Sequence, residues 1–514
     1  MSENNNRRKN EERNRLMAEQ LSKYFMNFKI HLAFPWIKAT TKTGGRPRTN
    51  SDILLLRLQE SGILLDDEEQ TIEECTIAAS QFIKSMNQSG CFNGVQVKID
   101  EHEEPGKSRL NVLLDEKKWY QLYVGGGLKN DGMNSSNNFL PKVQFETTGS
   151  LLNLTGFLDK TRISYAVDQA SETTLTMSHE RPLISCLPEF LPVYDALFQM
   201  VDGSEYHMVA RAAFDTIDHE WSRSYKEYQR LVSLRLANRS AKIPEMTEGG
   251  YFGLDWTFVF RDIIPRRHIK LPYHCDASHE IVSQSGPTAK NSLTWEYHTN
   301  GKYMDSQFDP TTGTDINAKL ELAGPPGDVG FLKAEGRASS HIPIVHNGLS
   351  LHTSVSSGVL HAISFGDMCG PPTISDRFFV GGPLELRGFL PSGIGPRAST
   401  PGGSSVPGGD ALGGNFFYTA TLAASVPAPD LFHLGINMRL FGFANAGTLL
   451  TGLPSISEVS HLQSIFRSTR VAVGGGLAAE TPFGRAELTY AVPLRYGPRD
   501  SRKSVQLGFG LNFG

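Results

Sequence analysis

The sequence predicts a mostly β protein: a sixteen-stranded antiparallel transmembrane β-barrel preceded by one small α+β domain. Two observations lead to this prediction. From Trp119 to the end of the 514-residue chain, apolar and polar residues alternate in one run after another. Before that point, residues 28–118 combine helical and strand patterns. No run of eighteen apolar residues occurs, which argues against a transmembrane helix but not against membrane-spanning strands.

The composition excludes several classes of protein. The formal net charge is −4 and the pI is about 6.4, so no global basic field indicates a nucleic-acid partner. The five cysteines are scattered and odd in number, which is not the pattern of a disulfide framework. The first twenty residues contain no apolar segment of a secretory signal, and their acidic residues argue against a mitochondrial presequence.

The chain before the barrel divides into an extension and a domain. Residues 1–27 are predicted to be a partly helical extension, because residues 10–28 have amphipathic spacing typical of a docking helix or a membrane-surface helix. Residues 28–118 follow the order strand, helix, helix, strand, strand. The predicted strands are 28–37, 95–100 and 108–116, and the predicted helices are 51–62 and 71–86.

Residues 119–514 are predicted to form the barrel. Apolar residues such as Phe260 and Leu488 alternate with charged residues such as Arg261 and Glu487. The core of a β-sandwich could not bury those charges unpaired, whereas a water-filled barrel interior hydrates them. Sixteen strands with their connections would take about 25 residues each, which suits membrane strands of about 9–11 residues.

The sequence contains only incomplete matches to motifs for catalysis or cofactor binding. Residues 473–480 contain a G-x-G-x-x-A spacing, but a turn and another strand follow where a dinucleotide site needs a helix. His274, Cys275 and His279 lie close in sequence, without a second cluster at metal-ligand spacing. We therefore expect no enzymatic activity, no cofactor and no bound metal.

A series of ordered motifs resembles one known family. These are DRFFVGGPLELRGF (376–389), IGPR (394–397), ALGG (411–414), FANAG (443–447) and ETPFGRAELTYAVPL (480–494). Together with the small domain and the barrel, they resemble the central barrel of the mitochondrial sorting and assembly machinery, the SAM complex. That family is the eukaryotic relative of bacterial BamA. The resemblance covers roughly residues 28–514 and implies that residues 28–118 are a POTRA-like domain.

The resemblance also implies a long loop, about 385–414, that folds back into the barrel lumen. Its expected anchoring motif comprises Gly381, Gly382, Arg387, Gly388 and Phe389. The guanidinium of Arg387 would need acceptors on the inner wall, and its expected surroundings are Asn445, Gly447 and Glu487. Asn445 stands where bacterial relatives have a carboxylate, so this position can contribute a hydrogen bond at most.

A lateral seam is expected where the first barrel strand, about 119–129, meets the last, about 504–514. Glycines weaken strand pairing and would let such a seam open. The last strand also resembles the β-signal of mitochondrial barrel precursors. The residues assigned to the seam and the β-signal are Gly125, Gly126, Gly127, Gln506, Gly508, Leu511 and Phe513.

The implied function is that of an insertase for β-barrel precursor proteins in the mitochondrial outer membrane, with the N-terminus in the intermembrane space. Its implied partners are those precursors, accessory SAM-complex subunits and membrane lipid. A passive porin would lack the small domain and the Arg387 loop. A polypeptide-translocating channel of the outer membrane or outer envelope would keep both, but should add a transit peptide or several POTRA domains.

Overall fold

The computed structural model describes most of the chain in two compact units. The described residues are 26–41, 46–64, 69–104, 107–129, 142–168, 172–182, 207–219, 224–237, 251–267, 275–299, 303–306, 309–345, 348–398, 408–428, 437–452, 465–481 and 484–510. The first unit comprises residues 1–122, 149–162 and 179–197, and the second comprises 123–148, 163–178 and 198–514. The helix predicted within residues 10–28 lies almost wholly outside the described residues.

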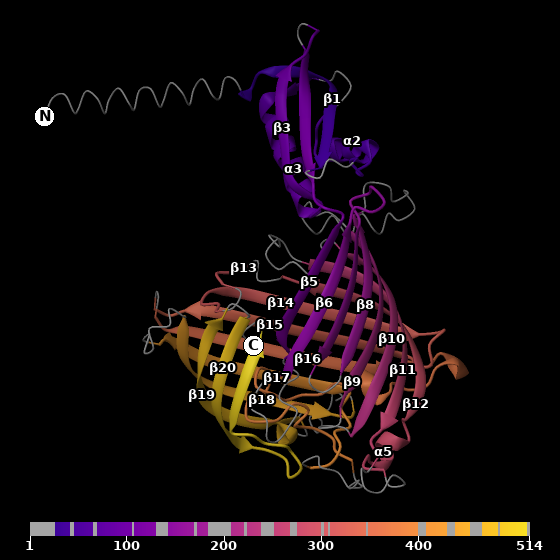
Figure 1. The fold of residues 1–514 in the computed structure, drawn as a ribbon. Coiled ribbons are helices and arrows are strands. Elements are labelled where there is room, and N and C mark those ends of the chain that lie inside the picture. The colour runs from indigo at the N-terminus through magenta and orange to yellow at the C-terminus, as the bar shows by residue number, and fades with distance from the viewer. Residues whose placement is uncertain are drawn as a thin grey trace, which may run out of the picture. The chain divides into compact units, whose positions relative to one another are not determined.

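The first unit contains an amino-terminal α+β domain (Figure 1). Its elements are β1 (Lys29–Thr41), α2 (Ser51–Glu60), β2 (Glu69–Thr71), α3 (Ile72–Gln88), β3 (Phe92–Glu101) and β4 (Lys107–Glu116). The sheet has the order β2-β1-β4-β3, with β1 parallel to β4 and the other pairs antiparallel. The sequence pattern missed β2, because three residues are too few for an alternation to register.

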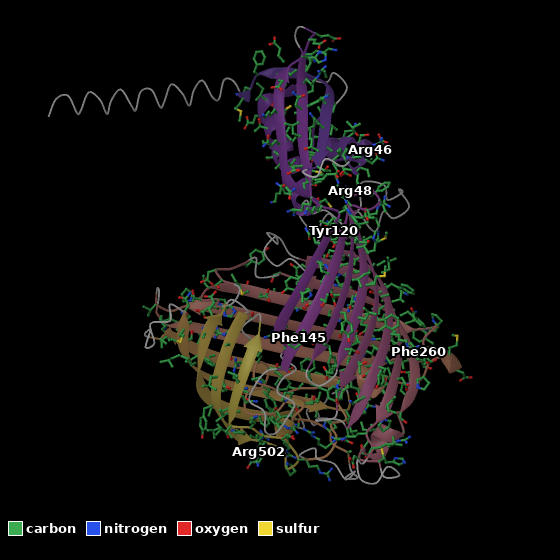
Figure 2. The ribbon with its side chains drawn as sticks, in the orientation of Figure 1. Arg46, Arg48, Tyr120, Phe145, Phe260 and Arg502 are labelled. Carbon is green, nitrogen blue, oxygen red and sulfur yellow. The ribbon has the colours of Figure 1, made fainter. Side chains whose placement is uncertain are left out.

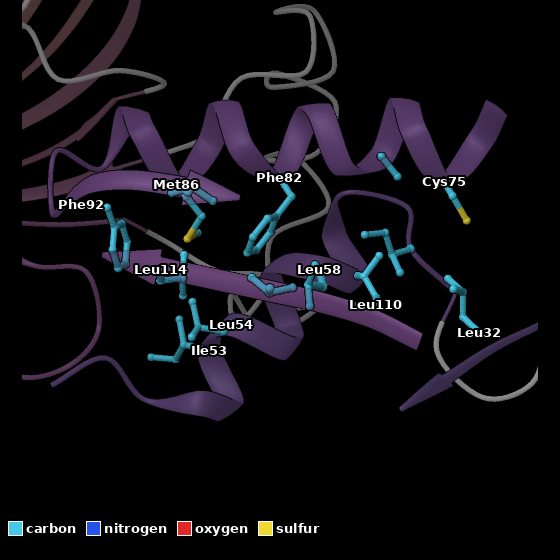
Figure 3. Close-up of a cluster of buried hydrophobic side chains, with 14 of the residues drawn as sticks. Leu32, Ile53, Leu54, Leu58, Cys75, Phe82, Met86, Phe92, Leu110 and Leu114 are labelled. Atoms are coloured by element: carbon cyan, nitrogen blue, oxygen red, sulfur yellow. The ribbon is translucent and has the colours of Figure 1, made fainter. Parts of the chain in front are cut away.

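Helix α3 packs its apolar face on this sheet. It begins with a capping box in which Thr71 and Glu74 exchange side-chain and backbone hydrogen bonds. Phe82 and Met86, both fully buried, point from α3 toward Leu110 and Leu114 of β4 (Figure 3). Helix α2 adds Ile53, Leu54 and Leu58 to the same core. The 3.6-residue spacing of the apolar positions therefore gives this small domain a continuous core.

The connection between β6 (Lys142–Leu152) and β7 (Lys160–Asp168) also belongs to the first unit. Leu158 from this connection is 3% exposed and joins the core of the α+β domain. Asn153 donates from Nδ2 to Thr49 Oγ1 at 2.7 Å, and Arg48 donates from NH1 to the carbonyl of Leu152 at 2.8 Å. Both polar and apolar contacts thus hold this connection against the domain.

The second sheet contains sixteen long antiparallel strands within the described residues. Besides β6 and β7 they are β5 (Tyr120–Lys129), β8 (Thr173–Pro182), β9 (His207–Asp218), β10 (Tyr225–Ala237), β11 (Tyr251–Pro265), β12 (Gly286–His298), β14 (Gly313–Gly324), β15 (Phe331–Pro343), β16 (Ser350–Ala362), β17 (Phe416–Pro427), β18 (Met438–Leu450), β19 (Arg470–Thr481), β20 (Gly484–Arg495) and β21 (Val505–Gly510). A seventeenth strand, β13 (Tyr303–Met304), has two residues and pairs with β14.

Neighbours in this sheet follow the chain order, which is the order of an up-and-down barrel. The strands run from β10 through β21, then from β5 to β9, and β9 also pairs with β10. The mostly β fold predicted from the alternation is confirmed. Among the described residues, no helix has the length and apolar character needed to cross a membrane.

The two faces of the wall differ in chemistry as the alternation predicted. On β11, Phe260 is 40% exposed whereas its neighbour Arg261 is 2% exposed. Phe145 on β6 is likewise exposed (Figure 2). On β20, Leu488 is exposed and Glu487 is fully buried. The period of two in the sequence therefore separates an apolar outer face from a charged inner face.

Candidate functional site: a loop fastened to the last strands

The site is built by the connection between β16 and β17, whose described parts are residues 363–398 and 408–415. We call this connection the long loop. It contains two short 3-10 helices, η2 (Gly366–Met368) and η3 (Ile374–Asp376). Leu386 and Phe389 are fully buried and form one hydrophobic cluster with Phe417, Leu449 and Ala472 of the wall. Apolar burial therefore seats the middle of this loop against strands β17 to β19.

Arg387 lies at the centre of this seat with no exposed surface. Its NH2 donates to Oε2 of Glu487 at 2.7 Å, and both side chains are 0% exposed. The other carboxylate oxygen of Glu487 accepts from Nε of Arg485 at 2.8 Å, and Arg485 reaches Asp309 Oδ1 at 2.9 Å. Glu487 is thus held between two cations, which is how a buried carboxylate remains ionised in an interior site.

Two aromatic rings of β18 complete the surroundings of the guanidinium. The central carbon of the Arg387 guanidinium lies 5.5 Å from the ring centre of Phe441 and 5.2 Å from that of Phe443. Both rings are within the range of cation–π attraction. Sequence reasoning missed these contacts, although Phe441 and Phe443 share one strand face with Asn445 and so could have been found from the alternation.

Asn445 and Gly447 contact the backbone and the neighbour of Arg387 rather than its guanidinium. Asn445 donates from Nδ2 to the carbonyl oxygen of Arg387 at 3.2 Å. A Cβ atom at Gly447 would lie 3.1 Å from Cδ1 of Leu386, so glycine leaves room for that side chain. Strand β18, which carries the FANAG motif, therefore positions the backbone of the long loop, while Glu487 provides the negative charge that pairs with Arg387.

The position of Gly388 requires glycine for two reasons, its positive φ and the lack of space for a side chain. Its φ is +93°, and a Cβ atom there would lie 3.2 Å from Ala472 Cβ and 3.3 Å from Ala491 Cβ. Gly381 and Gly382 also have positive φ values, +136° and +107°. These glycines let the long loop turn sharply at the wall, in a region of φ that other residues rarely adopt.

The last strand binds the long loop through Gln506. The backbone N–H of Gly388 donates to Gln506 Oε1 at 2.7 Å, and Gln506 Nε2 donates to the carbonyl of Phe389 at 2.8 Å. One carboxamide thus pairs with the N–H of Gly388, which would be costly to leave buried and unpaired, and with the carbonyl of Phe389, which also accepts from the N–H of Gly382 at 3.1 Å. A Cβ atom at Gly508 would lie 3.1 Å from Pro383, so this glycine also leaves room for the loop.

The connection between β20 and β21 forms a second set of contacts with the long loop. The N–H of Leu390 donates to the carbonyl of Ser501 at 2.9 Å, and the N–H of Lys503 donates to the carbonyl of Gly388 at 3.0 Å. Arg397 donates to the carbonyls of Gly409 and Ser392 at 3.0 and 2.8 Å. The side chain of Arg397 therefore connects separate segments of the long loop.

The remaining predicted residues lie on the first and last strands. Gly125, Gly126 and Gly127 are in β5, and the strand order places β5 beside β21. Leu511 and Phe513 lie outside the described residues. Residues 473–480 lie within β19, which continues as a strand to Thr481 and offers no helix for a dinucleotide.

The architecture and the site together define a class: a β-barrel whose long connecting loop is buried against its own last strands, preceded by an α+β domain. Residues 201–513 match the Omp85 superfamily domain, and the chain belongs to that superfamily. The resemblance read from the motifs is thereby confirmed.

Individual relatives agree with this assignment. The chain is 31% identical over 242 residues to a SAM50-like protein of Schizosaccharomyces pombe, covering 46% of this chain and 47% of that one. It is 32% identical over 252 residues to sorting and assembly machinery component 50 homolog B of Xenopus laevis, covering 46% and 48%. It is 30% identical over 233 residues to the outer membrane protein assembly factor BamA of Neorickettsia risticii, covering 45% and 29%.

These alignments span about half the length of the two SAM50-type relatives and less of the BamA sequence. Among solved structures, BamA from Haemophilus ducreyi lacking POTRA domains 1–3 has a similar fold, with a TM-score of 0.67 at 16% identity. That match covers 93% of this chain and 84% of the BamA chain.

Proposed function

We propose that this protein folds and inserts β-barrel precursor proteins into the mitochondrial outer membrane. The observation that carries the proposal is the burial of Arg387 against Glu487 together with the attachment of the same loop to Gln506 of the last strand. The relatives bearing the names SAM50 and BamA, the latter called an outer membrane protein assembly factor, support a role in assembly rather than in passive diffusion.

The insertion would take place at a lateral seam between β5 and β21. Three consecutive glycines in β5 weaken its hold on a partner strand, because glycine contributes no side-chain packing and loses more entropy on ordering. An incoming precursor strand would add to the freed edge through backbone hydrogen bonds. The long loop, bound to β21 through Gln506, would fix the position of one side of the seam.

The barrel would expose its apolar face to membrane lipid, with the amino-terminal α+β domain in the intermembrane space. This domain would be a POTRA-like module that offers the free edge of β3 to precursors. Accessory subunits of a SAM-type complex would be its further partners. Protease added to intact mitochondria should leave the domain uncut, and cleavage of it there would overturn this orientation.

Depletion of the protein tests the function directly. Mitochondria lacking it should accumulate newly imported porin in a protease-sensitive, unassembled form, and re-expression of the full chain should restore assembly. Normal assembly of porin after depletion would refute an insertase. A defect confined to import of precursors that are not β-barrels would instead favour a polypeptide-translocating channel.

A further inference from the structure

A second buried ion pair attaches the long loop to a strand other than those that contact Arg387. Arg261 of β11 donates from NH1 and NH2 to the two carboxylate oxygens of Asp376, at 2.7 and 3.1 Å. Their side chains are 3% and 0% exposed. Asp376 is the last residue of η3. This short helix lies in the descending limb, which is the part of the long loop between β16 and the region of Arg387. A forked, two-bond contact fixes orientation as well as distance, so this pair restricts the descending limb strongly.

Neighbouring strands contribute further polar contacts to the same point. Lys333 of β15 donates from Nζ to the backbone carbonyl of Asp376 at 2.9 Å. Ser375 donates from Oγ to Glu227 of β10 at 2.9 Å. Lys290 of β12 lies 3.9 Å from Asp376 Oδ1. Because burying so many charges stabilises a fold little, stability alone is a weak reason for the cluster.

The returning limb, which is the part of the long loop between the region of Arg387 and β17, contacts residues next to the same strands as the descending limb. Asp410 is 2% exposed and accepts from Ser224 Oγ at 2.6 Å and from the N–H of Ser278 at 2.8 Å. Ser224 immediately precedes β10, and Ser278 precedes the short helix α5 (His279–Val282) between β11 and β12. Both limbs are therefore fastened near strands β10 to β12, whereas the middle of the loop is fastened to β18, β20 and β21.

The strand that binds Asp376 and the strand that binds Arg387 are separated by nearly half of the strands of the wall. With the two-residue β13 set aside, seven strands separate β11 from β20 in the sheet order, out of sixteen. We propose that the long loop is a strut across the barrel, and that Asp376 and Arg261 are positioning residues that form its far end. They act through the loop backbone to keep Gly388 and Phe389 seated on Gln506.

This inference deepens the proposed function, since the strut would carry the position of β11 to the seam strand β21. Its test needs no precursor protein. A Cβ atom at Gly508 would lie 3.1 Å from Pro383 Cβ, which is slightly shorter than the Cβ separation of a disulfide, so a small outward shift of the loop brings the pair into bonding geometry. The double variant Pro383→Cys with Gly508→Cys, with the native cysteines replaced, should therefore form a disulfide on mild oxidation in membranes and report that the loop is seated on β21.

In this reporter, Asp376→Asn should lower the disulfide yield at least about threefold, because it weakens the charged contact that holds the limb. Asp262→Asn is the matched control, since it removes the next carboxylate on the opposite face of β11 and should leave the yield unchanged. A wild-type yield with Asp376→Asn would overturn the proposal. So would an equal loss in the Asp262→Asn control.

Arg261→Lys provides a second reading, because lysine keeps the charge but cannot make the forked contact. It should lower the yield less than Asp376→Asn does, with the inserted barrel intact. Failure of both variants to insert would also overturn the proposal, because the pair would then hold the wall rather than the loop. Reduced disulfide yield with normal porin assembly would confirm the strut while refuting its role in the proposed function.

Discussion

Arg387 and Glu487 are 100 positions apart in the sequence, and their side chains meet at 2.7 Å without any exposed surface. The contact joins the long loop to β20, which is the direct neighbour of the last strand, β21, in the strand order. The loop and the last strands are therefore one structural unit, and changes at either partner should affect the same property.

The first prediction concerns the charge of Arg387. Arg387→Ala should leave the barrel inserted, because the strand ladders are unchanged, but it should reduce assembly of imported porin at least about tenfold. Breaking a buried ion pair typically costs about 3–5 kcal/mol, and about 1.4 kcal/mol already corresponds to a tenfold effect. Arg387→Lys should rescue only part of the activity, because lysine cannot reproduce the planar contacts with the two phenylalanine rings.

Arg502→Ala is the appropriate control for this prediction. Arg502 lies in the connection between β20 and β21, where it is exposed and its guanidinium stacks on Tyr496 at 3.9 Å. Its substitution therefore removes an arginine near the long loop without removing a side chain that the loop is packed against. Arg397 would be a poor control, since it bonds to two carbonyls of the same loop. Equal assembly rates for Arg387→Ala and the wild-type protein, at matched abundance, would show that this contact is dispensable.

The second prediction separates backbone strain from crowding. Gly388→Ala places a methyl group 3.2 Å from Ala472 Cβ, at a φ of +93°. Gly409→Ala meets the same strain, at a φ of +89°, but its nearest contact is an ordinary 3.5 Å. Positive φ costs about 1–2 kcal/mol in both variants. Gly388→Ala should therefore impair porin assembly clearly more than Gly409→Ala, and similar defects in both would mean that crowding at the wall is unimportant.

The third prediction concerns the carboxamide of Gln506. Gln506→Ala should leave the N–H of Gly388 buried and unpaired, at about 1–3 kcal/mol, and should leave the carbonyl of Phe389 with the N–H of Gly382 as its remaining donor. The loop should then become accessible to added protease in isolated membranes. Leu507→Ala, which alters the opposite face of the same strand, should keep the loop protected. Protection of the loop in Gln506→Ala would contradict the role assigned to this side chain.

The fourth prediction concerns the amino-terminal domain. Deletion of residues 28–116 should slow porin assembly severalfold rather than abolish it, because a single strand edge gives transient contact. Leu158→Ser should be included, since Leu158 would otherwise be exposed once its domain is removed. Complete loss of assembly by a stably inserted deletion variant would show that the domain is essential.

The alternation of residues was sufficient to predict the wall, because burial on one face imposes a period of two that is visible locally. Phe260 and Arg261 illustrate this, as do Leu488 and Glu487. The contact between Asp376 and Arg261 was not predictable in this way. Its partners are 115 positions apart, and nothing in either local sequence distinguishes them from other charged residues. Long-range pairing across a barrel depends on strand register, which the pattern alone does not provide.

Gln506 shows a different limit of sequence reasoning. The β-signal resemblance drew attention to the residue, but assigned it to the seam alone. In the structure, its carboxamide binds the long loop, and Gly508 leaves room for Pro383. A polar residue that faces inward from the last strand could equally have been solvated, so only the position of the loop identifies its partner.

The fifth prediction concerns the two buried thiols of the α+β domain. Burial raises the pKa of Cys75 and of Cys91 from 9.0 to about 11. Because the folded state favours the protonated thiols, their contribution to stability is complete below pH 9 and is lost as the pH rises from about 9 to 11. At pH 8 both should resist alkylation in the folded protein, whereas exposed Cys275 should react readily. Mass spectrometry of the alkylated full-length protein measures each site. Cys75 and Cys91 should become reactive only above about pH 10 or on unfolding, and rates at pH 8 equal to that of Cys275 would contradict the burial of the domain core.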